Sequence, residues 1–219
     1  MEKTFSPEYV ILLHGLGRTR FSMSRIAERL ESQGLKVLNV GYPSTRKNFD
    51  ALIHEYLAPV VSDCEKRNAS KIHVVTHSLG GILIRAYLQD HRLPKGSRIV
   101  MLSPPNQGSE VVDYLKKFVW FTWIMGPTAV KLGTHPESLP KHLKEIPYEI
   151  GIITGNVISD PWFSALIPGV HDGKVSVENA KLKEMTDFLV VPCGHTFIMR
   201  SGKTINQIHY FLQFGHFQK

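Results

Sequence analysis

The chain has 219 residues, of which 42% are hydrophobic and 21% are charged, so it can bury a sizeable core and shows no compositional sign of disorder. Its formal net charge is +7, which favours weak attraction to anionic surfaces. The basic residues are dispersed, with no more than two adjacent, so we expect no nucleic-acid groove.

The two cysteines, Cys64 and Cys193, lie far apart and outside any metal-ligand spacing, which predicts free thiols. The N-terminus shows no apolar segment before a cleavage site, because the first apolar run, Val10–Leu13, leads straight into His14 and Gly15. No run approaches the roughly 20 apolar residues that a membrane span needs. We therefore expect a soluble cytoplasmic chain.

Short apolar runs alternate with helical patterns along the chain. The runs are rich in Val, Ile and Leu at successive positions, as strands buried on both faces are. The expected strands are Tyr9–Leu13, Lys36–Val40, Lys71–Thr76, Arg98–Leu102, Glu149–Thr154 and Asp187–Val191. Repeated alternation of this kind implies right-handed crossovers and a parallel sheet that is covered by helices on both faces.

Four segments carry apolar residues at helical spacing, namely residues 19–34, 48–67, 79–89 and 203–214. In the second segment, Pro59 should kink or split the helix, because it removes a backbone hydrogen bond. In the first, the inward-facing stripe is expected to comprise Phe21, Ile26, Ala27 and Leu30. In the last, the inward-facing residues are expected to be Ile205, Ile208, Phe211 and Leu212.

The loops that follow the expected strands bring polar residues to one edge of the sheet, because the carboxyl ends of parallel strands meet there. Ser78 follows the third strand in the stretch THSLG. The loop after the fifth strand contains Asp160 and Asp172, and His195 follows the sixth. A serine, one or two aspartates and a histidine should therefore meet, in the chain order Ser, Asp, His.

That order, with a serine between a strand and a helix, resembles the α/β-hydrolases, and above all compact serine lipases, esterases and the deacylases related to GPI remodelling. THSLG resembles their nucleophile elbow, G-x-S-x-G, with Thr76 in place of the first glycine. LLHGLGRT resembles their oxyanion loop, HDGKVS their acid loop and CGHTFIM their final histidine loop. The resemblance implies an α/β-hydrolase fold with about six mostly parallel strands, helices on both faces and a short cap insertion.

The resemblance also implies a role for each matching position. Ser78 would be the nucleophile, His195 its base, and Asp172 the acid that orients the imidazole. The backbone N–H groups of Leu16 and Leu79 would form the oxyanion hole. The implied reaction is hydrolysis of a small-molecule or lipid acyl ester through an acyl-enzyme, with no metal and no cofactor.

The alternation of strands and helices is interrupted at residues 104–147, which contain six prolines and the aromatic patch Phe118–Met125. We expect a cap- or lid-like insertion within a single domain spanning residues 1–219. An apolar patch of this kind usually belongs to the core. Alternatively it lines the substrate pocket, and Lys116 and Lys117 beside it would suit weak contact with an anionic membrane surface. The candidate pocket residues are Phe118, Trp120, Phe121 and Trp123.

Several alternatives stay open at this point. Ser78 could serve as a helix N-cap. His209 and His216 compete as the base, whereas His77 is too close to the serine in sequence to be expected in that role, and Asp160 competes as the acid. The same three residue types would serve an acyltransferase or a thioesterase, and a non-catalytic binding module could retain this scaffold.

Overall fold

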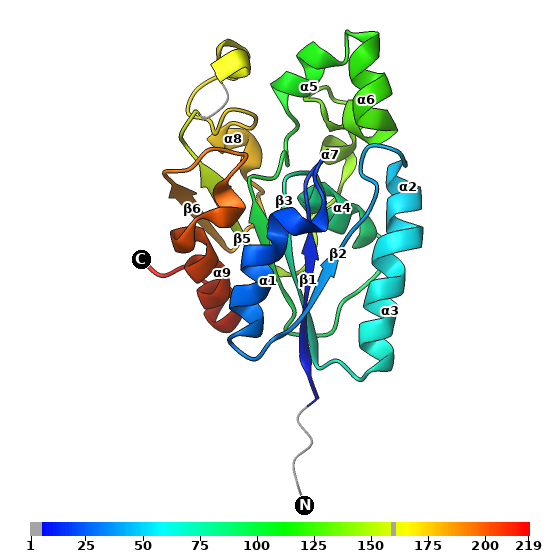
Figure 1. The fold of residues 1–219 in the computed structure, drawn as a ribbon, viewed down its shortest axis with the longest axis vertical. Coiled ribbons are helices and arrows are strands. Elements are labelled where there is room, and N and C mark those ends of the chain that lie inside the picture. The colour runs from blue at the N-terminus through cyan, green and yellow to red at the C-terminus, as the bar shows by residue number, and fades with distance from the viewer. Residues whose placement is uncertain (1–5, 159–160) are drawn as a thin grey trace, which may run out of the picture.

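The protein folds around a six-stranded sheet, which the computed structural model describes within residues 6–158 and 161–219 (Figure 1). Neighbouring strands pair in parallel, in the order β2-β1-β3-β4-β5-β6. The strands are β1 (Glu8–Leu13), β2 (Lys36–Val40), β3 (Lys71–His77), β4 (Arg98–Leu102), β5 (Glu149–Gly155) and β6 (Asp187–Val191). The expected strands are therefore confirmed, each with bounds within one residue of those expected.

The strand order reverses between β1 and β3, because the chain leaves β1 for β2 on one side and returns to β3 on the other. Ligand sites in open α/β sheets lie at the carboxyl ends of the strands where the order reverses. There Leu13 of β1 pairs with Thr76 of β3, so the loops that follow these two strands begin side by side.

Two hydrophobic cores lie on the two faces of the sheet, because successive side chains of a strand point to opposite faces. The helices that cover the sheet include α1 (Ser24–Glu31), α3 (Ala58–Lys66), α4 (Leu79–Tyr87) and α9 (Gly202–Phe214). Val10 and Leu12 pack with α1 and α9, in front of the sheet in Figure 1, whereas Ile11 and Leu13 pack with α3 and α4. The residues of α9 that were expected to face inward are all buried: Ile205, Ile208, Phe211 and Leu212.

Phe21 does not join the core, contrary to the sequence-based expectation, and its side chain is 71% exposed. It lies in a short 3-10 helix, η1 (Arg20–Met23), that precedes α1. Because a 3-10 helix has three residues per turn rather than 3.6, the buried stripe that Ile26 and Leu30 continue begins at Met23 instead.

The segment around Pro59 stays helical throughout. A short helix, α2 (Phe49–Leu52), continues into a wider π-helical turn, η2 (Ile53–Leu57), and then into α3. Pro59 lies in the first turn of α3, where a missing N–H group is tolerated. The interruption that the sequence predicted therefore takes the form of a change in helical pitch just before the proline.

Residues 104–147 lie beyond the carboxyl ends of the strands, at the top of Figure 1. Their α-helices are α5 (Glu110–Leu115), α6 (Val119–Ala129) and α7 (Leu139–His142). The backbone of α6 is kinked at Gly126, whose φ of 77° and ψ of 179° are not helical. The buried Arg85 of α4 fastens both ends of this segment, because its guanidinium donates to Asn106 and to the carbonyl of Leu143. In the described part of the chain, none of the helices has the length and apolar character needed to cross a membrane.

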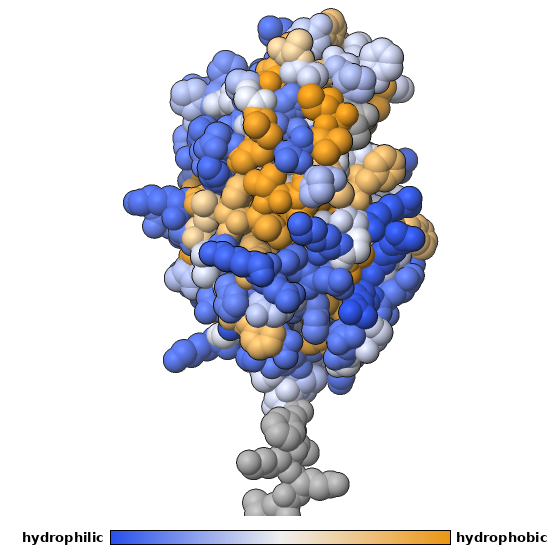
Figure 2. Space-filling view, turned by 90° about the vertical axis from the view of Figure 1, so that its left-hand side faces the viewer, coloured by the Kyte–Doolittle hydropathy of each residue, from blue (hydrophilic) through white to orange (hydrophobic). Residues whose placement is uncertain are grey.

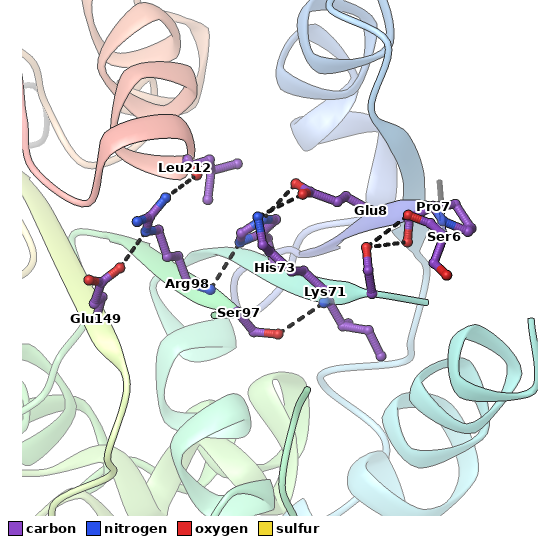
Figure 3. A network of polar contacts seen from close by, with 11 residues as sticks. Ser6, Pro7, Glu8, Lys71, His73, Ser97, Arg98, Glu149 and Leu212 are labelled. Carbon is purple, nitrogen blue, oxygen red and sulfur yellow. Dashed lines mark hydrogen bonds and ion pairs between the residues drawn. The ribbon is translucent and has the colours of Figure 1, made fainter. Parts of the chain in front are cut away.

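A polar network joins the strands at the opposite, amino-terminal edge of the sheet (Figure 3). The buried His73 accepts the Arg98 N–H at 2.9 Å through Nδ1, and its Nε2 lies 3.4 Å from the Glu8 carboxylate. Lys71 pairs with Glu8 at 2.7 Å, and the Arg98 guanidinium pairs with Glu149. Burial lowers the pKa of His73 despite the nearby Glu8 carboxylate, so the folded protein favours the neutral ring.

This lowered pKa predicts a pH-dependent stability. Below the ordinary histidine pKa of about 6.5, the unfolded chain takes up a proton that the folded His73 resists, so stability that is present at higher pH is lost as the pH falls. We expect His73→Asn, which keeps a hydrogen-bond acceptor for Arg98 but does not titrate, to reduce this loss. The measurement is urea unfolding at pH 7.5 and 5.5, and an unchanged loss in the variant would contradict the assignment.

Candidate active site

Ser78 occupies a strained turn between β3 and α4. Its backbone has φ 52° and ψ −117°, a region that side-chain-bearing residues rarely enter. Such strain persists only where the surrounding structure enforces it, and it is concentrated at functional sites. Ser78 is the residue before α4, yet its hydroxyl makes no capping hydrogen bond. The alternative role of Ser78 as a helix N-cap therefore does not describe the structure.

Glycines allow the strand, the turn and the helix to approach one another closely. A Cβ atom at Gly80 would lie 2.6 Å from the Leu13 carbonyl oxygen, and one at Gly81 would lie 2.9 Å from Pro104 Cβ. The hydroxyl of the buried Thr76 would lie 3.4 Å from the same Gly81 Cβ position, which is an ordinary contact distance. The close approach at this turn therefore depends on Gly80 and Gly81.

His195 and Asp172 form a buried hydrogen-bonded pair at the same edge of the sheet. His195 Nδ1 lies 2.8 Å from Asp172 Oδ2, and the other carboxylate oxygen accepts the N–H groups of Lys174 and Val175 at 3.0 and 2.9 Å. The His195 N–H also donates to the Asp172 carbonyl at 2.9 Å. Because a carboxylate accepts the Nδ1 proton, Nε2 is left as the basic nitrogen.

The hydrogen bonds to Asp172 favour its ionised form. Burial alone raises the pKa of this carboxyl, but the charge and hydrogen bond of His195, together with the Ser103 hydroxyl and the Val175 N–H, bring the pKa below its ordinary value. Asp172 is therefore a carboxylate at neutral pH. The competing aspartate, Asp160, lies outside the described residues.

The other histidines considered from the sequence have different surroundings. His209 lines a hollow with Glu8 and His73 at the amino-terminal edge of the sheet, and His216 follows α9. His77 does lie beside His195, where its Nε2–H donates to the His195 carbonyl at 3.0 Å. Burial lowers the pKa of His77 well below its ordinary value, so this ring is neutral. The contact ties the loop of His195 to the turn of Ser78.

The loop proposed for the oxyanion hole, residues 14–17, is held in place by contacts with Tyr42 and Ser44 in the loop after β2. The ring of His14 stacks on Tyr42 with 3.9 Å between centroids, and the Tyr42 hydroxyl donates to the His14 carbonyl. The Gly17 N–H donates to the Ser44 hydroxyl at 3.1 Å. Leu16, between these contacts, lines the pocket, while Leu79 lies in the first turn of α4, where N–H groups have no partner within the helix.

A pocket of about 180 Å³ opens over Ser78, His77 and His195. Phe121 lines it, as the sequence predicted for this residue. Phe118, Trp120 and Trp123, for which the sequence predicted the same place, do not line this pocket, and Trp123 is 85% exposed. The remaining pocket residues are Leu16, Arg18, Pro105, Ser109, Val111, Val112, Leu115, Met125, Leu132, Phe163, Lys174 and Val175.

The helical spacing of some pocket residues could be recognised in the sequence. Val111, Val112 and Leu115 recur at helical spacing, and Met125 follows Phe121 by one helical turn. Arg18 and Phe163 lie in irregular segments, where periodicity gives no direction. Within the described residues, no cluster of three or more His, Cys, Asp or Glu side chains could hold a metal ion.

The sequence matches the palmitoyl protein thioesterase family over residues 9–149. The chain belongs to the palmitoyl protein thioesterase family. No curated protein sequence matches it. Membership of this family makes the chain a hydrolase of the esterase, lipase or thioesterase type.

Solved structures show that this family member shares its α/β-hydrolase fold with lipases and esterases. The mature lipase BlEst2 of Bacillus licheniformis superposes with a TM-score of 0.76 at 19% identity, over 94% of this chain and 92% of that one. Phospholipase PlaB of Legionella pneumophila gives 0.70 at 17% identity, over 95% of this chain and 59% of that one. A carboxylesterase from Nitrososphaera gargenis superposes with a TM-score of 0.57 at 17% identity, over 95% of this chain and 91% of that one.

The contact between His77 and the His195 carbonyl predicts that His77 is a positioning residue. His77→Leu removes the donor and leaves a buried carbonyl unpaired, at a cost of about 1–3 kcal/mol, and should lower kcat on a soluble ester more than it changes KM. His77→Gln supplies an amide donor and should recover part of the loss. Equal kcat values for the Leu and Gln variants, at matched melting temperatures, would argue against this role.

Proposed function

We propose that the protein hydrolyses carboxylic esters through an acyl-enzyme on Ser78. The observation that carries this proposal is the pairing of His195 with the buried, ionised Asp172 beside a pocket that also contains the strained Ser78. A serine hydroxyl is a poor nucleophile until an adjacent base accepts its proton. The same arrangement would be hard to explain in a binding module, which needs neither an ionised Asp–His pair nor a strained serine.

The proposed reaction has two halves. Ser78 Oγ attacks the acyl carbonyl while His195 Nε2 takes the hydroxyl proton, and the resulting oxyanion is held by the N–H groups of Leu16 and Leu79. The bond to the leaving group then breaks as His195 returns the proton to the departing alcohol or thiol. Water, deprotonated by His195, attacks the acyl-enzyme and releases the carboxylic acid with Ser78 restored.

A thioester is the second candidate substrate class, and the family match favours it. The chemistry at Ser78 is the same for both classes, because only the leaving group differs. Rates on butyryl thiocholine and butyryl choline, which differ only in the scissile sulfur or oxygen, would separate the two. A preference for the thioester beyond the ratio of the two uncatalysed hydrolysis rates would favour the thioesterase.

The proposed roles predict the ranking of three variants. Ser78→Ala removes the nucleophile and should abolish turnover of a 4-nitrophenyl ester, whereas Asp172→Asn should lower kcat by roughly 10⁴-fold by favouring the wrong tautomer of His195. Asp160→Asn serves as the matched control and should have a mild effect. Retained turnover in Ser78→Ala, or a larger loss in Asp160→Asn than in Asp172→Asn, would contradict the assignment.

The apolar pocket predicts a preference for medium-length acyl chains. Each buried methylene contributes about 0.8 kcal/mol, so kcat/KM should rise by up to roughly fourfold per methylene from acetyl towards octanoyl esters. Phe121→Leu, inside the pocket, should lower the octanoyl-to-acetyl ratio. The matched variant Phe118→Leu, outside the pocket, should leave that ratio unchanged, and a wild-type enzyme fastest on acetyl esters would refute the prediction.

A further inference from the structure

The first part of α6, up to the kink at Gly126, carries apolar side chains at every position except the exposed Thr122, although one side of it faces solvent. Residues 118–130 contain no charged side chain. Phe121 points into the pocket, whereas Val119 and Trp123 are 87% and 85% exposed, and Trp120 and Ile124 are about half exposed. A helix that is hydrophobic all round is normally buried. The exposed side chains on the outer face of α6 are therefore suited to contact with an apolar partner rather than with water.

A second apolar projection lies beside α5, the helix that precedes α6. The 3-10 helix η4 (Pro161–Leu166) contacts α5, and it carries Phe163 in the pocket wall and Trp162 on the outside with 85% exposure. On the face that Figure 2 shows, which is the left-hand side of Figure 1, hydrophobic residues are concentrated in the upper half and the lower half is largely hydrophilic. The exposed side chains of α6 and Trp162 thus project from elements that also line the pocket.

Basic residues flank the apolar helix on both sides along the chain. Lys117 precedes α6 and lies 6.0 Å from the centre of the Tyr114 ring, and Lys131 follows α6 in the short helix η3 (Val130–Leu132). Both are exposed. Exposed tryptophans with lysines beside them are typical of helices that lie in the interface of a bilayer, because tryptophan prefers the headgroup level and lysine pairs with anionic lipid.

We propose that the outer face of α6, together with Trp162, binds the surface of an anionic lipid bilayer. The helix would lie parallel to the membrane, with Val119, Trp120, Trp123 and Ile124 among the headgroups and the lysines at their phosphates. The pocket mouth would then face the lipid, so that an acyl chain enters without crossing water. A lipid surface fits better than a second protein, because protein interfaces surround their apolar centre with polar partners, whereas Thr122 is the one polar side chain on the exposed face of α6.

The test separates lipid binding from catalysis by using the full chain with Ser78→Ala, which cannot consume lipid. Co-sedimentation with phosphatidylcholine vesicles is compared with vesicles that contain about 30% phosphatidylglycerol. We expect binding to the anionic vesicles, with a blue shift in tryptophan fluorescence, and weak binding to the neutral ones. Added salt should weaken the binding, because the lysine contribution is electrostatic.

Two double variants, each compared with a control variant, locate the contact. Trp123→Gln with Trp162→Gln should weaken vesicle binding roughly tenfold or more, whereas Phe214→Ser, which removes a half-exposed aromatic near the opposite edge of the sheet, should not. Lys117→Gln with Lys131→Gln should also weaken binding roughly tenfold or more. Lys66→Gln with Lys95→Gln removes the same charge from the amino-terminal edge and should have a much smaller effect.

Three results with vesicles would overturn the proposal: no binding to either vesicle, binding that is unchanged in the tryptophan double variant, or equal loss for the two lysine double variants. A concentration-dependent dimer that Trp123→Gln with Trp162→Gln converts to a monomer would overturn it in favour of a second copy of this chain. Because hydrolysis of soluble esters is measured separately on the wild type, failure of lipid binding leaves the proposed reaction standing.

Discussion

The close approach of α4 to β1 is the constraint on which the site depends. Only a residue without a side chain fits at position 80, where a Cβ would lie 2.6 Å from the Leu13 carbonyl oxygen. This approach leaves no room for a relaxed connection between β3 and the helix, so Ser78 takes a positive φ and sits at the amino end of α4. The positive end of the helix dipole then lies where negative charge would develop on a substrate.

The rest of the site is built by loops that are fixed to this turn. His77, adjacent to the serine, donates to the carbonyl of His195, and His195 in turn is held by the ionised Asp172. Both imidazoles are buried. His77 is hydrogen-bonded to a carbonyl, whereas His195 is hydrogen-bonded to a carboxylate, which can stabilise the imidazolium that forms when His195 accepts a proton. We therefore propose different tasks for these two histidines, whose rings lie 4.9 Å apart, because their partners differ.

The sequence predicted the parts of this arrangement that depend on local pattern. Continuous apolar runs indicated the strands, and the positions of Ser78, Asp172 and His195 in the loops that follow them placed all three at one edge. The orientation of α6 was not predictable, since a helix with apolar residues on every side gives no periodic signal for its inner face. Trp120 and Trp123 were therefore assigned to a pocket that only Phe121 and Met125 of this helix reach. The π-helical turn before Pro59 likewise depends on how the chain packs around the proline.

We propose that Ser78 is a nucleophile activated by its surroundings rather than an ordinary hydroxyl. The most direct test is covalent labelling with a fluorophosphonate probe, followed by mass spectrometry of the labelled peptide. We expect one adduct, on Ser78, which is lost in Ser78→Ala and after denaturation and which forms much more slowly in His195→Ala. A folded protein that stays unlabelled, or that is labelled at another residue, would contradict it.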